Sequence, residues 1–278
     1  MPDRVLRVYS GRNRPDLGPI YRLFEGYTDT KVEVEMIYHL DVERRLLDER
    51  GDPRADVLVT NSQVAVEAVR ETGIFEPYSA EVARGYDEWL RAPDYAWLSF
   101  TAWPRSAMIN PRVLPDVAVW PTTVEGLADP RLRGKISMAT TNEETTVSQW
   151  SSIRAAKGDD YAWGLVDRLL ANGLRTYESN KATREGLIAD RNAVALVKGA
   201  KHGDAARAFI DFLLSAEIQT LLARMFGETP VNPRAITGPV RPLAEIRRTP
   251  ASLAKITALR DSTRAHLTKK GFAPPARD

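Results

Sequence analysis

The chain of 278 residues contains no cysteine. Disulfides, zinc–thiolate sites, iron–sulfur clusters and cysteine nucleophiles are therefore excluded. It also has no apolar run near the roughly 20 residues that a membrane-spanning helix needs. Neither sign of charge dominates, because 39 Lys and Arg face 37 Asp and Glu, a formal net charge of +2. Since nucleic-acid binders usually present a clustered basic face, no nucleic-acid partner is expected.

Familiar catalytic motifs are missing as well. The sequence has no nucleophilic-serine motif, phosphate-binding glycine loop, dinucleotide fingerprint or HExxH. Its three histidines, His39, His202 and His266, share no metal-ligand spacing, so surface positions are expected for them. We predict no enzyme and no resident cofactor. An α/β enzyme would need titratable groups gathered in a cleft, which makes it the least favoured class.

Strands and helices alternate along most of the chain. The first part predicts strands at 5–9, 31–37 and 55–60, and helices at 15–26, 41–50 and from Ser62 onward. This order predicts right-handed crossovers and a mainly parallel sheet. Strand 31–37 places Val32, Val34 and Met36 on one face and should be half exposed. A second α/β region predicts strands 134–139 and 174–177 with helices 145–157, 159–172 and 181–189.

The segment NAVALVKGAKHGDAARAFIDFLLSAEIQ, residues 192–219, predicts a buried strand, a turn and an amphipathic helix with Asp204 as its N-cap. It resembles the bacterial extracellular solute-binding proteins of ABC importers, and most nearly their iron(III)- and phosphonate-type branch. LRVYSGR (6–12), the stretch 55–78 and the stretch 121–141 resemble the same family, in family order.

This resemblance implies an α/β fold of the two-lobe, periplasmic-binding-protein-like (type II) kind, joined by hinge strands. We expect lobe one to comprise residues 1–101 and 192–278, and a shortened lobe two to comprise 102–191. The family captures a small-molecule or metal-ion ligand in the interlobe cleft and docks on the membrane permease of an ABC importer. The mature protein would be periplasmic or on the cell surface. The N-terminus MPDRVLRVYSG lacks a signal-peptide core, so either a leader is removed or the protein is cytoplasmic. The alternative is a non-transport sensor or interaction module on this fold.

Iron-binding members of the family typically use a tyrosine pair with a histidine and a carboxylate or an anion, because ferric ion prefers anionic oxygens. This sequence has no adjacent tyrosine pair, and Asn13 stands where some members carry histidine. Asp190 is followed almost directly by Asn192, which leaves no room for the strand that should carry the pair. The transported ligand is therefore expected to be Fe(3+) or a small anionic, phosphonate-like solute, with the metal ligands unassigned.

Ligand-binding candidates follow the predicted strands, where helix N-termini and polar side chains favour anions. They are Ser10, Arg12, Asn13, Asn61, Ser62, Thr141, Asn142, Ser179 and Asn180. Arg12 and Arg14 could clamp a carboxylate or phosphonate, or could be solvated or paired with Asp16 and Glu25. Ser62, Thr141 and Asn142 could instead serve only as helix caps, and Tyr177 could be a core residue.

Overall fold

The computed structural model describes residues 4–12, 17–38, 41–102, 109–178, 192–238, 240–246 and 249–273. The chain divides into two compact units, each made of two segments. The first unit comprises Met1–Trp103 and Asp190–Ile246, and the second comprises Pro104–Ala189 and Arg247–Asp278. This division differs from the predicted lobes at the C-terminus, because residues 247–278 belong with the second unit.

A mixed sheet forms the centre of the first unit. Its strands lie in the order β2-β1-β3-β8-β5-β9, with β4 also paired to β8. The bounds are β1 Val5–Ser10, β2 Lys31–Met36, β3 Val57–Thr60, β4 Phe75–Glu76, β5 Leu98–Ala102, β8 Asn192–Val197 and β9 Thr229–Pro230. All six residues of β8 are buried, which confirms the reading of its apolar run as a covered strand.

Strand directions differ from the predicted, mainly parallel sheet. β1 is parallel to β2 and β3, but β8 is antiparallel to β3, and β5 is antiparallel to β8. The reason is the route of the chain. β8 begins at the edge where β3 ends, so Ala193 pairs with Thr60 and β8 runs back along β3. A crossover helix would have carried it to the opposite edge.

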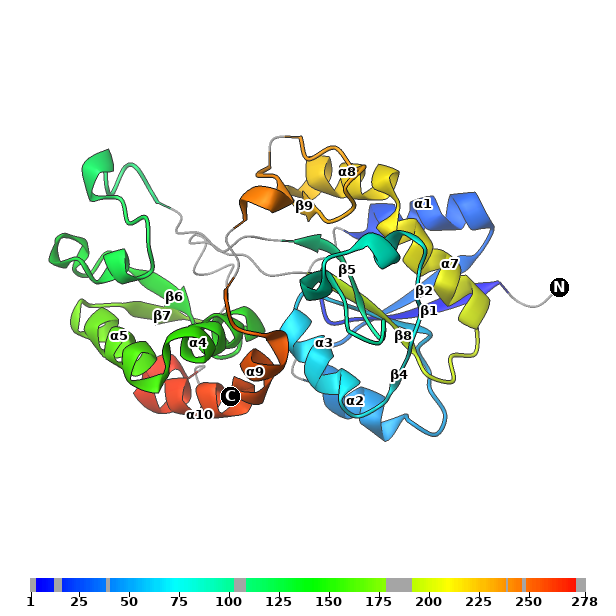
Figure 1. Ribbon diagram of the computed structural model, residues 1–278, viewed down its shortest axis with the longest axis horizontal. Coiled ribbons are helices and arrows are strands. Elements are labelled where there is room, and N and C mark those ends of the chain that lie inside the picture. The colour runs from blue at the N-terminus through cyan, green and yellow to red at the C-terminus, as the bar shows by residue number, and fades with distance from the viewer. Residues whose placement is uncertain are drawn as a thin grey trace. The chain divides into compact units, whose positions relative to one another are not determined.

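Helices cover both faces of this sheet, with α1 and α7 on one side and α2 and α3 on the other (Figure 1). The bounds are α1 Gly18–Thr28, α2 Val42–Asp48, α3 Gln63–Arg70, α7 Gly203–Leu214 and α8 Ala216–Phe226. The predicted face of α7 is confirmed, since Ala206, Phe209, Ile210 and Leu213 are all buried. Phe24 of α1 packs edge-on against Phe209, with ring centroids 5.2 Å apart.

Two local predictions for the first unit are wrong. Asp204 does not cap α7: the helix begins at Gly203 after His202, and Asp204 lies exposed in its first turn. There its carboxylate still faces the positive end of the helix dipole. The apolar face of β2 is not buried as a half-exposed strand requires, since Val34 is 38% and Met36 51% exposed. This strand lies at the end of the strand order, beside β1 only.

The second unit has a small parallel sheet of β6 Ser137–Ala139 and β7 Arg175–Tyr177. Its helices are α4 Glu144–Lys157, α5 Asp159–Ala171, α9 Leu253–Ala258 and α10 Arg260–Leu267, followed by a last turn, η8 Thr268–Phe272. Leu267 and Phe272 are fully buried in one core with Trp150 and Leu165. That shared core is why the C-terminal segment joins this unit. The predicted helix 181–189 lies outside the described residues.

Short 3-10 helices connect these elements: η2 Val82–Gly85, η3 Glu88–Leu90, η4 Val117–Val119, η5 Glu125–Ala128, η6 Pro130–Leu132 and η7 Leu243–Glu245. In the part of the chain described here, no helix has the length and apolar character to cross a membrane.

Candidate functional site

Polar residues gather at one edge of the sheet in the first unit. β1 and β3 end there at Ser10 and Thr60, and β8 begins there at Asn192. Thr101 of β5 lies opposite Asn192 in the sheet register. We call this the polar edge, and it also includes Arg12 after β1 and Glu228 before β9. Ligand sites of open α/β sheets lie beyond the carboxyl ends of strands, so this is the first unit's candidate site.

Arg12 is the charged centre of the polar edge. Its side chain is only 1% exposed, and its Nη2 donates to Oε1 of Glu228, which is fully buried. Arg12 is therefore neither solvated nor paired with Glu25. The sequence could not show this pair, because its members are 216 residues apart. Because both side chains are buried, removing either one alone would leave a costly unpaired charge in the interior.

Two residues of neighbouring strands bind the second carboxylate oxygen of Glu228. Oε2 of Glu228 accepts from Thr101 Oγ1 at 2.5 Å and from Asn192 Nδ2 at 2.9 Å. Asn192 Nδ2 also lies 2.6 Å from Thr101 Oγ1. None of Thr101, Asn192 and Glu228 was predicted as a site residue from the sequence. The one local signal was a polar Asn at the first position of an otherwise apolar strand.

The remaining candidates of the first unit lie on the loops beside Arg12. Ser10 Oγ is 3.4 Å from both the backbone N and O of Arg12. Asn61 is half-buried. Ser62 is the N-cap of α3, where its Oγ accepts from the amide of Ala65 at 3.2 Å, so the capping alternative is confirmed. Asn13 lies outside the described residues.

Tyr9 directly precedes Ser10, but its hydroxyl is engaged elsewhere. It donates to Oε2 of Glu49 at 2.8 Å. Burial, followed by this hydrogen bond, raises the pKa of Tyr9. A tyrosine ligand to ferric ion acts as the phenolate, which this environment disfavours. The Tyr9 hydroxyl is therefore engaged by Glu49.

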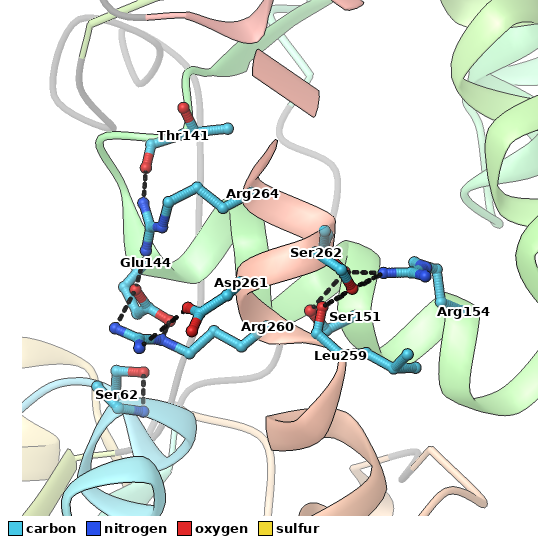
Figure 2. A network of polar contacts seen from close by, with 12 residues as sticks. Ser62, Thr141, Glu144, Ser151, Arg154, Leu259, Arg260, Asp261, Ser262 and Arg264 are labelled. Carbon is cyan, nitrogen blue, oxygen red and sulfur yellow. Dashed lines mark hydrogen bonds and ion pairs between the residues drawn. The ribbon is translucent and has the colours of Figure 1, made fainter. Parts of the chain in front are cut away.

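Thr141, in the second unit, is held by the C-terminal segment. Its amide and its Oγ1 both donate to the carbonyl of Phe272, at 2.9 and 3.1 Å. Arg264 of α10 donates to the Thr141 carbonyl (Figure 2). Asn142 is half-buried next to it, its amide 3.4 Å from Thr140 Oγ1. The loop after β6 is thus positioned by residues more than a hundred positions later in the chain.

Glu144 connects this loop to α10. Its carboxylate is 3% exposed and lies between the guanidinium groups of Arg260 and Arg264 (Figure 2). Nearby, Arg154 Nη1 donates to Ser262 Oγ and Thr263 Oγ1, each at 2.8 Å. These bonds attach α10 to α4 by charge-assisted contacts, which are stronger than neutral ones.

The other residues singled out from the sequence belong neither to the polar edge nor to the contacts between α10 and the loop after β6. Ser179 and Asn180 lie outside the described residues, and Tyr177 is 39% exposed, so it is not a core residue. His202 Nδ1 is bound to the buried Asp56 at 2.9 Å, and His266 stacks on Trp163, so neither is a simple surface histidine. The described ranges hold no group of three or more His, Cys, Asp or Glu side chains that could bind a metal ion.

Comparison with known proteins identifies the class. Iron-bound HitA from Pseudomonas aeruginosa matches with a TM-score of 0.83 and 19% identity, over 95% of this chain and 99% of that one. AfuA from Actinobacillus pleuropneumoniae, solved with fructose-6-phosphate, matches with a TM-score of 0.78 and 18% identity, over 95% and 96%. The fold is therefore the two-lobe α/β fold of periplasmic binding proteins, as predicted.

The sequence comparisons identify the family. The family model described as "bacterial extracellular solute-binding protein" matches residues 52–190, which is half of the chain. Iron uptake protein A1 of Synechocystis is 28% identical over 274 residues, covering 81% of this chain and 75% of the relative. The chain belongs to the bacterial extracellular solute-binding protein family, which confirms the resemblance found in its sequence.

Proposed function

We propose that this protein is the solute-binding component of an ABC importer. It captures its solute outside the cytoplasmic membrane and delivers it to a membrane permease, without covalent chemistry. Membership of the solute-binding family supports this role. In such proteins the ligand stabilises one conformation through contacts that the other lacks.

The solute that we propose is ferric iron or a small anion. Iron is supported by the names of relatives, an iron uptake protein and an iron-bound HitA. An anion is supported by the polar edge, which presents hydroxyl, amide and guanidinium groups. The fructose-6-phosphate bound to AfuA shows that this fold also accommodates an organic phosphate. The choice between ferric iron and a small anion depends on the groups of the polar edge.

Thermal unfolding of the purified chain tests the capture of a solute. Ferric citrate, ferric ion with carbonate, citrate, inorganic phosphate, a phosphonate and fructose-6-phosphate would be compared with glucose as a neutral control. A ligand at a hundred times its Kd stabilises the folded form by about 2.7 kcal/mol. That should raise the Tm by about 5 °C or more. A flat Tm across all six would contradict the proposed solutes.

Transport requires a second assay. The chain would be added to proteoliposomes that contain the permease of its importer, and ATP hydrolysis would be followed with and without solute. Stimulation that depends on this chain supports the importer role. If hydrolysis stays at its basal rate with every solute that shifts the Tm, the protein binds solute for another purpose.

A further inference from the structure

The turn between α5 and β7 contains the one Asn-Gly dipeptide of the sequence, Asn172–Gly173. Asparagine before glycine is the dipeptide most prone to deamidation, because glycine has no side chain to hinder the attack of its backbone nitrogen. That nitrogen loses its proton and bonds to Cγ of the asparagine, while the Cγ–Nδ2 bond breaks and ammonia leaves. Water then opens the cyclic imide at either carbonyl, which gives aspartate or isoaspartate.

The end of α5 requires this glycine. Gly173 has a φ of +76°, and its amide donates to the carbonyl of Leu170 at 2.9 Å. The amide of Leu174 donates to the carbonyl of Leu169 at 3.0 Å, so the two bonds complete a Schellman motif with glycine at its left-handed position. A Cβ on Gly173 would also lie 3.1 Å from both N and Cα of Gly134. Any other residue would be strained and crowded there, so the fold itself imposes the reactive dipeptide.

The native turn keeps the reacting groups engaged. Asn172 is 7% exposed, and its Nδ2 donates to the carbonyls of Asp129 and Leu127, at 2.8 and 3.3 Å. Its own carbonyl accepts from the amide of Gly134 at 2.9 Å. The attacking nitrogen, that of Gly173, holds its proton in a backbone hydrogen bond. Because the nucleophile and the leaving group are both hydrogen-bonded and the side chain is buried from water, the folded turn should resist the reaction.

The product would not fit the place that the asparagine occupies. An aspartate at position 172 would turn an oxygen instead of an NH₂ group toward the carbonyls of Leu127 and Asp129. A buried carboxylate that faces only acceptors is costly, since no donor replaces the water it has lost. Isoaspartate would lengthen the backbone by one methylene and so disturb the close approach of Gly173 to Gly134. Either product should therefore keep the turn from re-forming.

We propose that Asn172 is a modification site, a deamidation site with water as the second reactant, which folding protects and local opening exposes. This inference goes beyond solute capture and does not depend on it. Reaction can begin only while the turn is open, and the product prevents reclosure. The rate should therefore equal that of the unfolded chain multiplied by the fraction of molecules in which the turn is open.

The rate of conversion tests the protection. Trypsin releases residues 169–175, LLANGLR, and mass spectrometry separates the amide and acid forms of this peptide. The synthetic peptide gives the unprotected rate, and hydrogen exchange of the Leu174 amide gives the open fraction. The chain in urea should convert as the peptide does. The native chain should convert at least about tenfold more slowly, which corresponds to an opening free energy of about 1.4 kcal/mol. Conversion of the native chain as fast as the peptide would overturn the proposal.

Asn172→Asp tests the consequence of the reaction. It should lower the ratio of folded to unfolded protein at least about tenfold, as measured by urea denaturation followed through near-UV circular dichroism. Asn110→Asp is the matched control, because Oδ1 of the exposed Asn110 accepts from the amide of Arg112 at 3.0 Å and an acid keeps that acceptor. Asn110→Asp should unfold as the wild type does. Equal stability of Asn172→Asp and wild type would overturn the proposal.

Wild-type protein aged in urea covers the case in which Asn172→Asp does not fold. After return to buffer, the sample holds modified and unmodified molecules, and brief proteolysis removes those whose second unit stays open. The surviving protein should yield LLANGLR in its amide form, while the whole sample yields both forms. An equal share of the acid form before and after proteolysis would show that the modified turn still closes, and the proposal would be wrong.

Discussion

Buried charged side chains in this protein are held by several partners each. Asp56 accepts from the amides of Arg7 and His202, at 2.8 and 2.9 Å, and Glu67 accepts from Trp97 Nε1 at 2.6 Å. Such carboxylates lose little by leaving water, because charge-assisted hydrogen bonds replace the solvent. Arg12 differs from these carboxylates, since its Nε and Nη1 both lack a partner in the described part of the molecule.

His266 makes stability depend on pH. Its ring stacks on Trp163 with centroids 3.8 Å apart. Burial first, then the cations Lys270 and Arg154, lower the pKa of His266, against a smaller opposing effect of Asp167 and Asp159. The unfolded state therefore binds the proton more readily than the folded state. The contribution to stability is complete above about pH 6.5, the usual histidine pKa, and is lost as the pH falls below it.

We therefore expect the free energy of unfolding to fall between pH 7 and pH 5, as measured by urea denaturation. His266→Phe keeps an aromatic ring on Trp163 but cannot titrate, so its profile should be flatter over that interval. Asp167→Asn should change the slope less, since Asp167 acts on the histidine only as a minor charge. If His266→Phe keeps the wild-type slope, another group is responsible.

Among the secondary-structure elements, the ends of helices depend most strongly on local sequence. Ser62, Ser215 and Ser252 each cap a helix by accepting from the amide three residues later. Capping depends only on neighbours in the chain, so the Ser62 cap could be predicted. Asp204 fails as a cap because α7 begins earlier, where the amide of His202 is bound to the buried Asp56, 146 residues away.

A second feature at the level of secondary-structure elements is the attachment of α10 to the loop after β6. We expect Glu144→Ala to leave Arg260 and Arg264 without their shared carboxylate and to destabilise the second unit by about 3 kcal/mol. The amide of Thr141, bonded to Phe272, should then exchange its hydrogen faster. Exchange measured by mass spectrometry over residues 137–145 checks this outcome.

Asp160→Ala is the control for that experiment, because Asp160 is an exposed acid in the first turn of α5. Its exchange pattern around Thr141 should match that of the wild type. Equal protection of Thr141 in Glu144→Ala and wild type would mean that Glu144 does not hold α10 against the loop.

For the whole molecule, each unit is built from two separate segments of chain. The second unit takes Leu267 and Phe272 into its core, so it is incomplete without the C-terminus. A chain that ends at residue 246 should keep the first unit folded and lose the packed core around Trp150. The two lost side chains alone contribute about 3–6 kcal/mol of burial.

Limited proteolysis and near-UV circular dichroism of that truncated chain test the division. Fragments from residues 104–189 should appear early, while the segments of the first unit persist. A chain that ends at residue 273 is the control and should resist digestion like the full-length protein. Resistance of residues 104–189 in the shorter chain would show that the C-terminal segment is dispensable there.

The sequence by itself determined the strands, the helices, the apolar face of α7, the buried β8 and the family, because hydrophobic period and capping act over a few residues. Only the tertiary structure decided the antiparallel direction of β8, the place of residues 247–278 and the partners of Arg12 and Glu144. These depend on contacts between segments that lie far apart in the chain. For Arg12 the sequence left an anion clamp and a solvated or paired arginine open, and only folding buried it beside Glu228, with Nε and Nη1 lacking a partner in the described part of the chain.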